Sequence, residues 1–306
     1  MVRVAQISVL AKVAGNVNAD EVIGQRITLK KFYTSEGEVK PFISARAVKY
    51  AIRQALKTQG FEVDPFQLER GRLFDSGNPL KYIDNDIFGF MVARRREEVA
   101  RRRQAPIALS YFRALRDTAI KAELGLRAPR LEGNPLPFEI EVAEWIGRLD
   151  CLIYDYIGVF EGKEGEIELE NGETLTAKAG QAFIDDKERR RRLKAFLDVF
   201  LTPSYVLPRR TNSLSIPEYL AALVSLSEKG PWPIYQYLDY GRVGDEIVVD
   251  TGLLTKLISR GFDFHKLWLI DYRKTTSTSE LPEGIEVVEA GALGDIINEI
   301  VEFLIK

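Results

Sequence analysis

Three observations in the sequence predict an α+β fold. Residues 2–15 alternate between apolar and polar side chains with a period of two, which is typical of a β-strand. Residues 44–58 instead carry apolar side chains at helical spacing and begin with Ser44, a good N-cap. Apolar stretches at 105–112 and 138–160 predict two further strands. With 306 residues, 45% of them hydrophobic, the chain is long enough to enclose a substantial core.

The middle of the chain predicts a hairpin and a second helix. The pair Asn171-Gly172 suits a type I′ turn and closes a hairpin over residues 165–180. Residues 185–201 begin with two aspartates, which favour a helix N-terminus, and then carry a stripe of leucine and phenylalanine side chains. Residues 216–227 fit either a short helix or a buried strand, and both alternatives stay open.

The order of these elements indicates a particular core. If residues 216–227 are a strand, the order is βαββαβ, the ferredoxin-like arrangement that RNA-recognition motifs also use. Residues 113–137 interrupt this order with a long stretch of little periodicity, and such insertions are usually functional or disordered. Residues 230–306 predict a smaller addition of helices and strands that ends in a C-terminal helix.

Composition excludes several classes of protein. The single Cys151 and the single His265 exclude a disulfide framework, and they leave no convincing catalytic triad and no histidine and cysteine metal site. The phosphate-binding loop and the dinucleotide-binding fingerprint are missing. No apolar run is long enough to span a membrane, and the N-terminus is too polar for a signal peptide, so we expect a cytoplasmic protein. We predict no cofactor and no metal.

Two acidic pairs are candidates for a metal site. Asp84 and Asp86 have a spacing found among ligands of hard cations, but the rest of a calcium loop is missing. A turn that orients the neighbouring phenylalanines is therefore the better interpretation. Asp20 and Glu21 follow the first strand, where a solvated loop is favoured over a site.

Basic residues are segregated, although the net charge is only −2. Residues 94–103 hold six arginines against two glutamates, and residues 187–194 hold six cations against one glutamate. The first predicted helix carries Arg46, Lys49 and Arg53 along one side. A solvated charged face is an alternative explanation for each of these stretches alone. Together they favour a surface that attracts a polyanion.

The first strand also limits how RNA can bind. An RNA-recognition motif stacks bases on aromatic side chains of its sheet, whereas residues 2–15 are small and aliphatic where those rings are needed. If this chain binds RNA, we expect it to bind through the RNA backbone.

Four sequence blocks occur in a specific order along the chain. They are NVNADEVIGQR (16–26), PFISARAVKYAIRQAL (41–56), DNDIFGFM (84–91) and RRRQAPIALSYF (101–112). Their order and spacing resemble the DevR-type branch of the repeated backbone subunit of type I CRISPR interference (Cascade) complexes. With the later strand and second helix, the resemblance covers roughly residues 1–225.

The resemblance implies a modified RNA-recognition fold shaped like a hand, which polymerises along the CRISPR RNA as a helical filament. Each copy would grip the sugar-phosphate backbone in its palm, and a hairpin thumb would displace one base per copy. It implies a core over residues 1–229, with a finger-like insertion at 59–104, a thumb at 113–137 and a C-terminal addition at 230–306. The implied partners are CRISPR RNA, the target DNA strand through the guide, further copies of the chain and other interference-complex subunits, with no membrane and no enzymatic activity.

The resemblance also implies where RNA is bound. Ser44 and the free amides of the first helical turn would bind a phosphate, and the cations of that helix would neutralise its neighbours. The predicted RNA-binding residues are Asn18, Arg26, Ser44, Arg46, Lys49, Arg53, Arg94, Arg95, Arg96, Arg101, Arg102, Arg103 and Arg127. The basic run at 187–194 fits an RNA contact or a subunit contact.

Two other functions stay open. Related backbone subunits of type III complexes cleave target RNA with an aspartate in the loop after the first strand, and Asp20 lies in the corresponding region. The chain would then be a metal-dependent RNA endonuclease. The second alternative is a regulator or assembly protein that binds no RNA and uses its basic faces for acidic protein partners.

Overall fold

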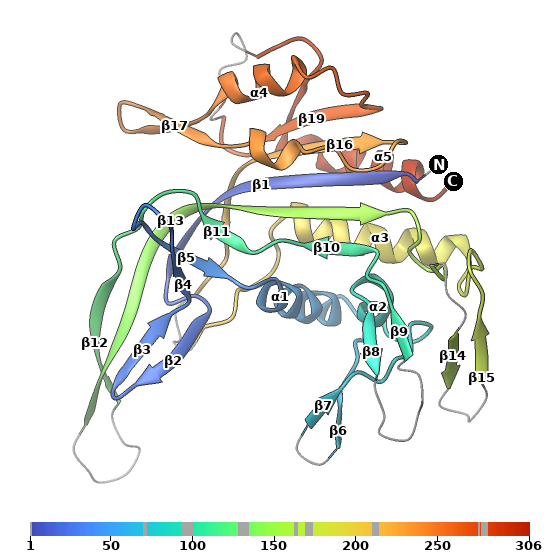
Figure 1. The fold of residues 1–306 in the computed structure, drawn as a ribbon, viewed down its shortest axis with the longest axis horizontal. Coiled ribbons are helices and arrows are strands. Elements are labelled where there is room, and N and C mark those ends of the chain that lie inside the picture. The colour runs from blue at the N-terminus through green and yellow to red at the C-terminus, as the bar shows by residue number, and fades with distance from the viewer. Residues whose placement is uncertain are drawn as a thin grey trace.

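The computed structural model describes residues 2–69, 72–92, 101–127, 135–161, 165–168, 174–209, 214–274, 276 and 281–306. They form a large, mostly antiparallel sheet with few helices, which confirms the predicted α+β class (Figure 1). The strands are β1 (Val4–Gly15), β2 (Ala19–Ile23), β3 (Arg26–Leu29), β4 (Lys31–Tyr33), β5 (Val39–Ile43), β6 (Gln67–Glu69), β7 (Arg72–Phe74), β8 (Phe90–Val92), β9 (Arg101–Arg103), β10 (Ile107–Leu109), β11 (Phe112–Ala114), β12 (Lys121–Arg127), β13 (Leu136–Tyr154), β14 (Gly165–Glu168), β15 (Thr174–Ala177), β16 (Glu218–Ser227), β17 (Tyr240–Val243), β18 (Glu246–Val249), β19 (Lys266–Asp271) and β20 (Glu286–Glu289). The helices are α1 (Ala45–Thr58), α2 (Ile83–Ile87), α3 (Asp186–Leu201), α4 (Thr251–Ile258) and α5 (Leu293–Leu304), with short 3₁₀ turns η1 (Ile234–Tyr237) and η3 (Ala290–Ala292).

The centre of the sheet is β1, which pairs antiparallel with β13 on one side and with β16 on the other. Beyond β13 the sheet continues through β10 and β11, and from β11 through β5 to β4. Beyond β16 it continues through β19 to β20, which runs parallel to β19. The last strands and α5 therefore extend the same sheet and core as the first strand.

The two faces of the sheet are covered by different parts of the chain. Ile7 and Val9 of β1 point to the face covered by α1, α3 and α5. Leu10 points to the opposite face and packs against η1 and α4. On that face the amide of Gln6 donates to the Trp232 carbonyl oxygen at 2.7 Å and accepts from the Trp232 backbone N–H at 2.6 Å. The C-terminal addition thus contributes to both faces, with η1 and α4 on one and α5 beside α1 and α3 on the other.

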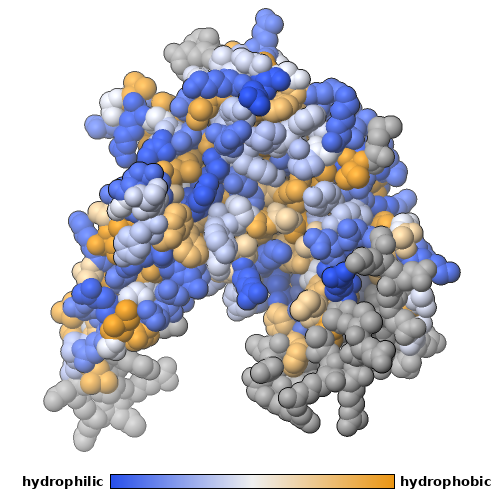
Figure 2. Space-filling model, in the orientation of Figure 1, coloured by the Kyte–Doolittle hydropathy of each residue, from blue (hydrophilic) through white to orange (hydrophobic). Residues whose placement is uncertain are grey.

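Two groups of strands extend from the helix side of the sheet (Figure 1). We call the first the strand limb: it consists of β12, the first half of β13, and β2 and β3. The second, the hairpin limb, consists of the pairs β6 with β7, β8 with β9, and β14 with β15. Helix α1 lies between the limbs at the inner end of the opening, and the space-filling view shows the surface hollowed there (Figure 2).

Several predicted elements are confirmed, and one open alternative is resolved. The strand predicted at 2–15 is β1, the helix predicted at 44–58 is α1, and the helix predicted at 185–201 is α3. Residues 216–227, which fitted helix or strand, contain β16, a strand with a buried position at nearly every residue. None of the helices in the described ranges is long and apolar enough to cross a membrane.

Other expectations need correction. Residues 113–137, which showed little periodicity, contain β12, because pairing with β13 supplies the order that the local pattern lacks. Residues 84–91 are not a simple turn but include part of the short helix α2, whose acidic side chains are buried. The predicted hairpin at 165–180 has its strands β14 and β15, while its Asn171-Gly172 turn lies outside the described residues.

Candidate nucleic-acid interface

Helix α1 presents a basic side at the inner end of the opening. Val48, Ile52 and Leu56 bury its other side in the core. The Ser44 hydroxyl accepts a hydrogen bond from the Ala47 backbone N–H at 3.3 Å, so it caps the helix as predicted. The first turn contains no acidic residue, which leaves the positive end of the helix dipole uncompensated by the helix itself.

Arg46 and Lys49 are the unpaired cations of this surface. Arg46 is exposed, and neither residue has a carboxylate partner among the residues that the structure describes. Lys49 is half-buried, with its Nζ 5.1 Å from the centroid of the Phe88 ring. Removal from water lowers the pKa of Lys49, because the charged form loses hydration that no carboxylate replaces. Lys49 is therefore a partly desolvated cation that no carboxylate of the described residues neutralises.

Arg53 does not belong to this free set. Its Nη2 atom lies 2.8 Å from Asp84 Oδ2 and donates to the Asp64 carbonyl oxygen at 2.7 Å. Its guanidinium also stacks over the Phe66 ring, 4.1 Å from the centroid, and only 12% of the side chain is exposed. Arg53 thus forms an internal ion pair that joins α1 to α2, and its predicted phosphate contact stays untested.

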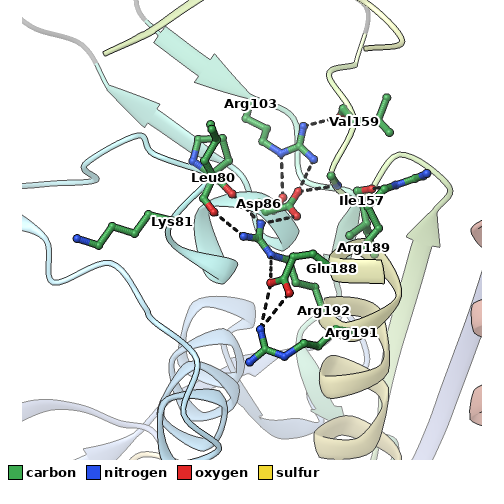
Figure 3. A network of polar contacts seen from close by, with 12 residues as sticks. Leu80, Lys81, Asp86, Arg103, Ile157, Val159, Glu188, Arg189, Arg191 and Arg192 are labelled. Atoms are coloured by element: carbon green, nitrogen blue, oxygen red, sulfur yellow. Dashed lines mark hydrogen bonds and ion pairs between the residues drawn. The ribbon is translucent and has the colours of Figure 1, made fainter. Parts of the chain in front are cut away.

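Asp86 is the centre of a buried polar network (Figure 3). The Arg103 Nη2 donates to Asp86 Oδ1 at 2.6 Å, and the Arg192 Nη1 donates to Asp86 Oδ2 at 3.0 Å. The Gly158 backbone N–H donates to the same Oδ1 at 3.0 Å. Asp86 is fully buried, and 3% of each arginine side chain is exposed. Arg103, predicted as an RNA contact, is instead a buried link between β9 and α2.

The basic run of α3 serves the same structural purpose. Arg192 also donates to the carbonyl oxygens of Pro79 and Leu80. Arg189 donates to the Ile157 carbonyl oxygen at 2.7 Å, and Arg190 is paired with Glu302 of α5. Arg189, Arg190 and Arg192 fasten neighbouring segments to the core. Lys187, Arg191 and Lys194 are exposed, so an RNA or subunit contact of this run stays a prediction for the exposed cations. Within the segment 59–104, this network holds the middle (Pro79, Leu80 and Asp86) and the end (Arg103).

Asn18 directly precedes β2 of the strand limb, and Arg26 is the first residue of β3 in the same limb. Asn18 is buried with a left-handed backbone (φ 56°), and its side-chain amide donates to the Phe42 carbonyl oxygen at 3.3 Å. Asn18 therefore has a structural role here, and its predicted RNA contact stays untested. Arg26 is half-exposed on β3 and lies 2.6 Å from Glu139. The structure does not bring either residue onto the surface of α1.

Of the remaining predicted arginines, Arg101 and Arg102 belong to β9 of the hairpin limb and Arg127 to β12 of the strand limb. Arg102 is exposed on β9, and its RNA contact stays a prediction. The side chains of Arg101 and Arg127 are outside the described part of the chain, although their backbones belong to β9 and β12. Arg94, Arg95 and Arg96 also lie outside the described residues.

Asp20, the residue on which the cleavage alternative depends, lies on β2. Its carboxylate is half-exposed and lies 3.4 Å from the Lys30 ammonium. Among the residues that the structure describes, no three histidine, cysteine, aspartate or glutamate side chains are grouped so that they could hold a metal ion. RNA cleavage through Asp20 stays an untested alternative.

Sequence reasoning missed the aromatic partners of the cations. The rings of Phe61, Phe66 and Phe88 each lie under a cationic side chain. These three rings come from the segments before and after the hairpin β6–β7, whereas their cations belong to α1 and α3. No local pattern marks such a contact, because each ring meets a partner that is distant along the chain.

Comparison with known proteins identifies the family. Residues 9–246 match the family model of the CRISPR-associated negative auto-regulator DevR/Csa2. The match spans most of the chain, which therefore belongs to the DevR/Csa2 family of CRISPR-associated proteins. This confirms the family resemblance that the four sequence blocks indicated. No match was found among curated proteins.

Solved structures share the fold. A chain of a structure described as "CRISPR RNA-guided surveillance complex" has a TM-score of 0.58 and 11% sequence identity, covering 97% of this chain and 99% of its own length. A chain of a structure described as "CRISPR RNA-guided surveillance complex, pre-nicking" has a TM-score of 0.59 and 12% identity with the same coverage. The shared architecture extends over nearly the whole of each chain, including residues 230–306.

Proposed function

We propose that this chain binds the sugar-phosphate backbone of CRISPR RNA, without regard to sequence, as the repeated filament subunit of a type I interference complex in antiviral defence. The observation that carries the proposal is the pair of cations on α1, Arg46 and Lys49, which face no internal carboxylate in the described structure. They lie on the helix at the inner end of an opening bounded by two limbs (Figure 2). A strand lying in that opening would meet positive charge and the N-terminal amides of α1.

The strand order supports a ferredoxin-like core. The strands β16, β1, β13 and β10 are neighbours in that order, with α1 and α3 in the two long connections and packed on one face. In RNA-recognition motifs the opposite face stacks bases. Here η1 and α4 cover much of that face, which favours binding on the helix side through the backbone.

The limbs support the proposed hand. The long hairpin of β12 and β13 belongs to the thumb that we propose, while the hairpins β6–β7 and β8–β9 belong to the finger-like insertion. A thumb that kinks the guide at intervals would explain why the hairpin extends so far from the sheet. Family membership and the fold shared with chains of surveillance complexes support assembly with further copies and other interference-complex subunits.

The test is binding of the purified chain to three single-stranded RNAs of unrelated sequence over a range of salt concentrations. We expect similar affinities for all three, a steep loss with salt, and a large loss in the double variant Arg46→Glu/Lys49→Glu. Lys194→Glu is the matched control, because Lys194 is a half-exposed cation of α3, a helix outside the opening.

Each rival function has its own outcome in this experiment. Mg²⁺-dependent shortening of the RNA that is lost in Asp20→Ala would establish the endonuclease. RNA binding without salt dependence, or no binding, would favour the regulator that acts on protein partners. Binding that survives the double variant would move the RNA site away from α1.

A further inference from the structure

Phe66 has a backbone conformation that its side chain does not favour. Its φ angle is 57°, in the left-handed region that glycine and asparagine adopt most readily. A bulky side chain is rare and strained there. Phe66 is the third residue of the sequence Asp64-Pro65-Phe66 and directly precedes β6. Glycine or asparagine would adopt this conformation more easily, so the choice of phenylalanine calls for an explanation.

Buried groups hold the strained residue in place. One carboxylate oxygen of Asp64 accepts a hydrogen bond from the Phe66 backbone N–H at 2.9 Å. The other accepts from the Ser76 backbone N–H at 2.7 Å and from the Asn85 side chain at 2.9 Å. Asp64 is 2% exposed, and its own N–H donates to Asp84 at 2.8 Å. The local conformation is thus fixed from several directions, as is typical of strain kept at functional sites.

The ring of Phe66 continues the basic side of α1. Arg53 stacks on it at 4.1 Å from the ring centroid, and Arg53 follows Arg46 and Lys49 along the same side of the helix. Lys49 and Arg53 are four positions apart, which is about 6 Å along the helix axis. Phe66 is half-buried and directly precedes β6, whose hairpin with β7 belongs to the hairpin limb that borders the opening (Figure 1).

We infer that Phe66 stacks against a base of the RNA strand that α1 binds through its phosphates. The inference rests on the proposed function and adds to it a residue that contacts the base face. Arg53 acts as a positioning residue here, because its charge is already neutralised by Asp84 and its guanidinium supports the ring. Stacking on one aromatic ring is tolerant of sequence, since every base has a π-face, so it fits a strand that can carry any guide.

The competing explanation is that the ring only shields the Arg53–Asp84 ion pair from water. The two explanations differ for Phe66→Asn, which tolerates the left-handed conformation but lacks the ring. Stacking predicts that its affinity for oligo-uridine RNA falls roughly ten-fold, with the thermal unfolding midpoint close to that of the wild type. Phe66→Tyr, which keeps a ring, is expected to retain the affinity.

Phe61→Asn is the matched control. The Phe61 ring is also half-buried in the same chain segment, and Arg191 stacks on it at 4.1 Å. Phe61 packs against the core beside α3, so its removal is expected to lower stability and leave RNA affinity unchanged. A fall in affinity of the same size in both variants would overturn the inference.

A second measurement does not depend on the folding of any variant. The wild-type chain is irradiated with oligo-uridine that contains 5-iodouridine, and the cross-linked peptide is identified by mass spectrometry. We expect a cross-link at Phe66. If the wild type binds RNA but shows no cross-link there, and Phe66→Asn binds equally well, this inference is wrong while the proposed function stands. If the wild type binds no RNA, both are wrong.

Discussion

Arg192 Nη1 lies 3.0 Å from Asp86 Oδ2 and so joins two residues that are 106 positions apart in the chain. Both side chains are buried, and the second oxygen of Asp86 is occupied by Arg103. The three residues belong to α3, α2 and β9, which makes this network the point where the hairpin limb is fixed to the core (Figure 3). The RNA surface that we propose depends on this frame, although none of its members contacts RNA in our proposal.

Asp86→Asn is expected to destabilise the protein strongly. The change leaves the buried Arg103 without its counter-charge and leaves Arg192 with Glu188 as its remaining carboxylate partner. Breaking a buried pair in this way typically costs about 3–5 kcal/mol. Urea unfolding measures the loss. Asp198→Asn is the control, because Asp198 pairs with Lys194 at the surface of α3 and its loss is expected to cost about 0.5 kcal/mol or less. Equal small losses in both variants would show that the network carries no stability.

Lys49→Met is expected to raise stability and weaken RNA binding together. Desolvation lowers the pKa of Lys49 in the folded chain, so the unfolded chain binds this proton more tightly and the charge costs stability at neutral pH. This loss of stability is complete at any pH below the pKa of Lys49 in the folded chain. It disappears as the pH rises through the ordinary pKa of lysine, which Lys49 has in the unfolded chain. The variant should therefore gain about 0.5–2 kcal/mol at pH 7, with a smaller gain near pH 10. A variant that is less stable at pH 7 would contradict the account of this lysine.

Arg46→Ala is expected to change the salt dependence of RNA binding. Each phosphate contact on a single strand contributes about 0.7 to the slope of log affinity against log salt, so removal of one contact should reduce the slope by about that amount. Titrations between low and physiological salt measure it. Lys194→Ala, which removes a cation from α3, should leave the slope unchanged, and a reduction there of equal size would mean that the effect is one of net charge alone.

Gly147→Ala is expected to destabilise the central sheet. A Cβ atom at this position of β13 would lie 2.5 Å from the Arg113 carbonyl oxygen and 2.3 Å from the Trp145 ring. Backbone in a paired strand cannot move away easily, so we expect a loss of about 1–3 kcal/mol in urea unfolding. Gly241→Ala is the control in another strand, because its added Cβ would meet Val248 at an ordinary 3.8 Å. A loss no larger than that of the control would show that the sheet opens here without strain.

The local elements were predictable because their signals lie within them. Helix α1 carries its own cap, Ser44, and its own apolar stripe, and β1 carries its own alternation. The strand β12 was missed because it is ordered by pairing with β13 and has no strong period of its own. The family was also predictable, since four blocks of sequence keep a specific order.

The partners of the charged residues were not predictable from the sequence. Arg53, Arg103 and Arg192 belong to three basic stretches that look alike, yet all three are neutralised by the buried carboxylates of α2. A row of cations has the same sequence pattern whether it meets solvent, a phosphate or a buried aspartate. Asp84 and Asp86 of α2 could have indicated these partners, because charged residues with apolar neighbours along the chain need buried partners of opposite charge.

The central claim is that copies of this chain coat a single strand of RNA. The most direct measurement is the mass of the complex, by analytical ultracentrifugation, on RNAs of increasing length and unrelated sequence, with electron microscopy of the same samples. The account predicts a mass that grows in steps of one chain as the RNA lengthens, filaments in the images, and the loss of both in Arg46→Glu/Lys49→Glu. A constant stoichiometry of one chain per RNA, whatever its length, would contradict it.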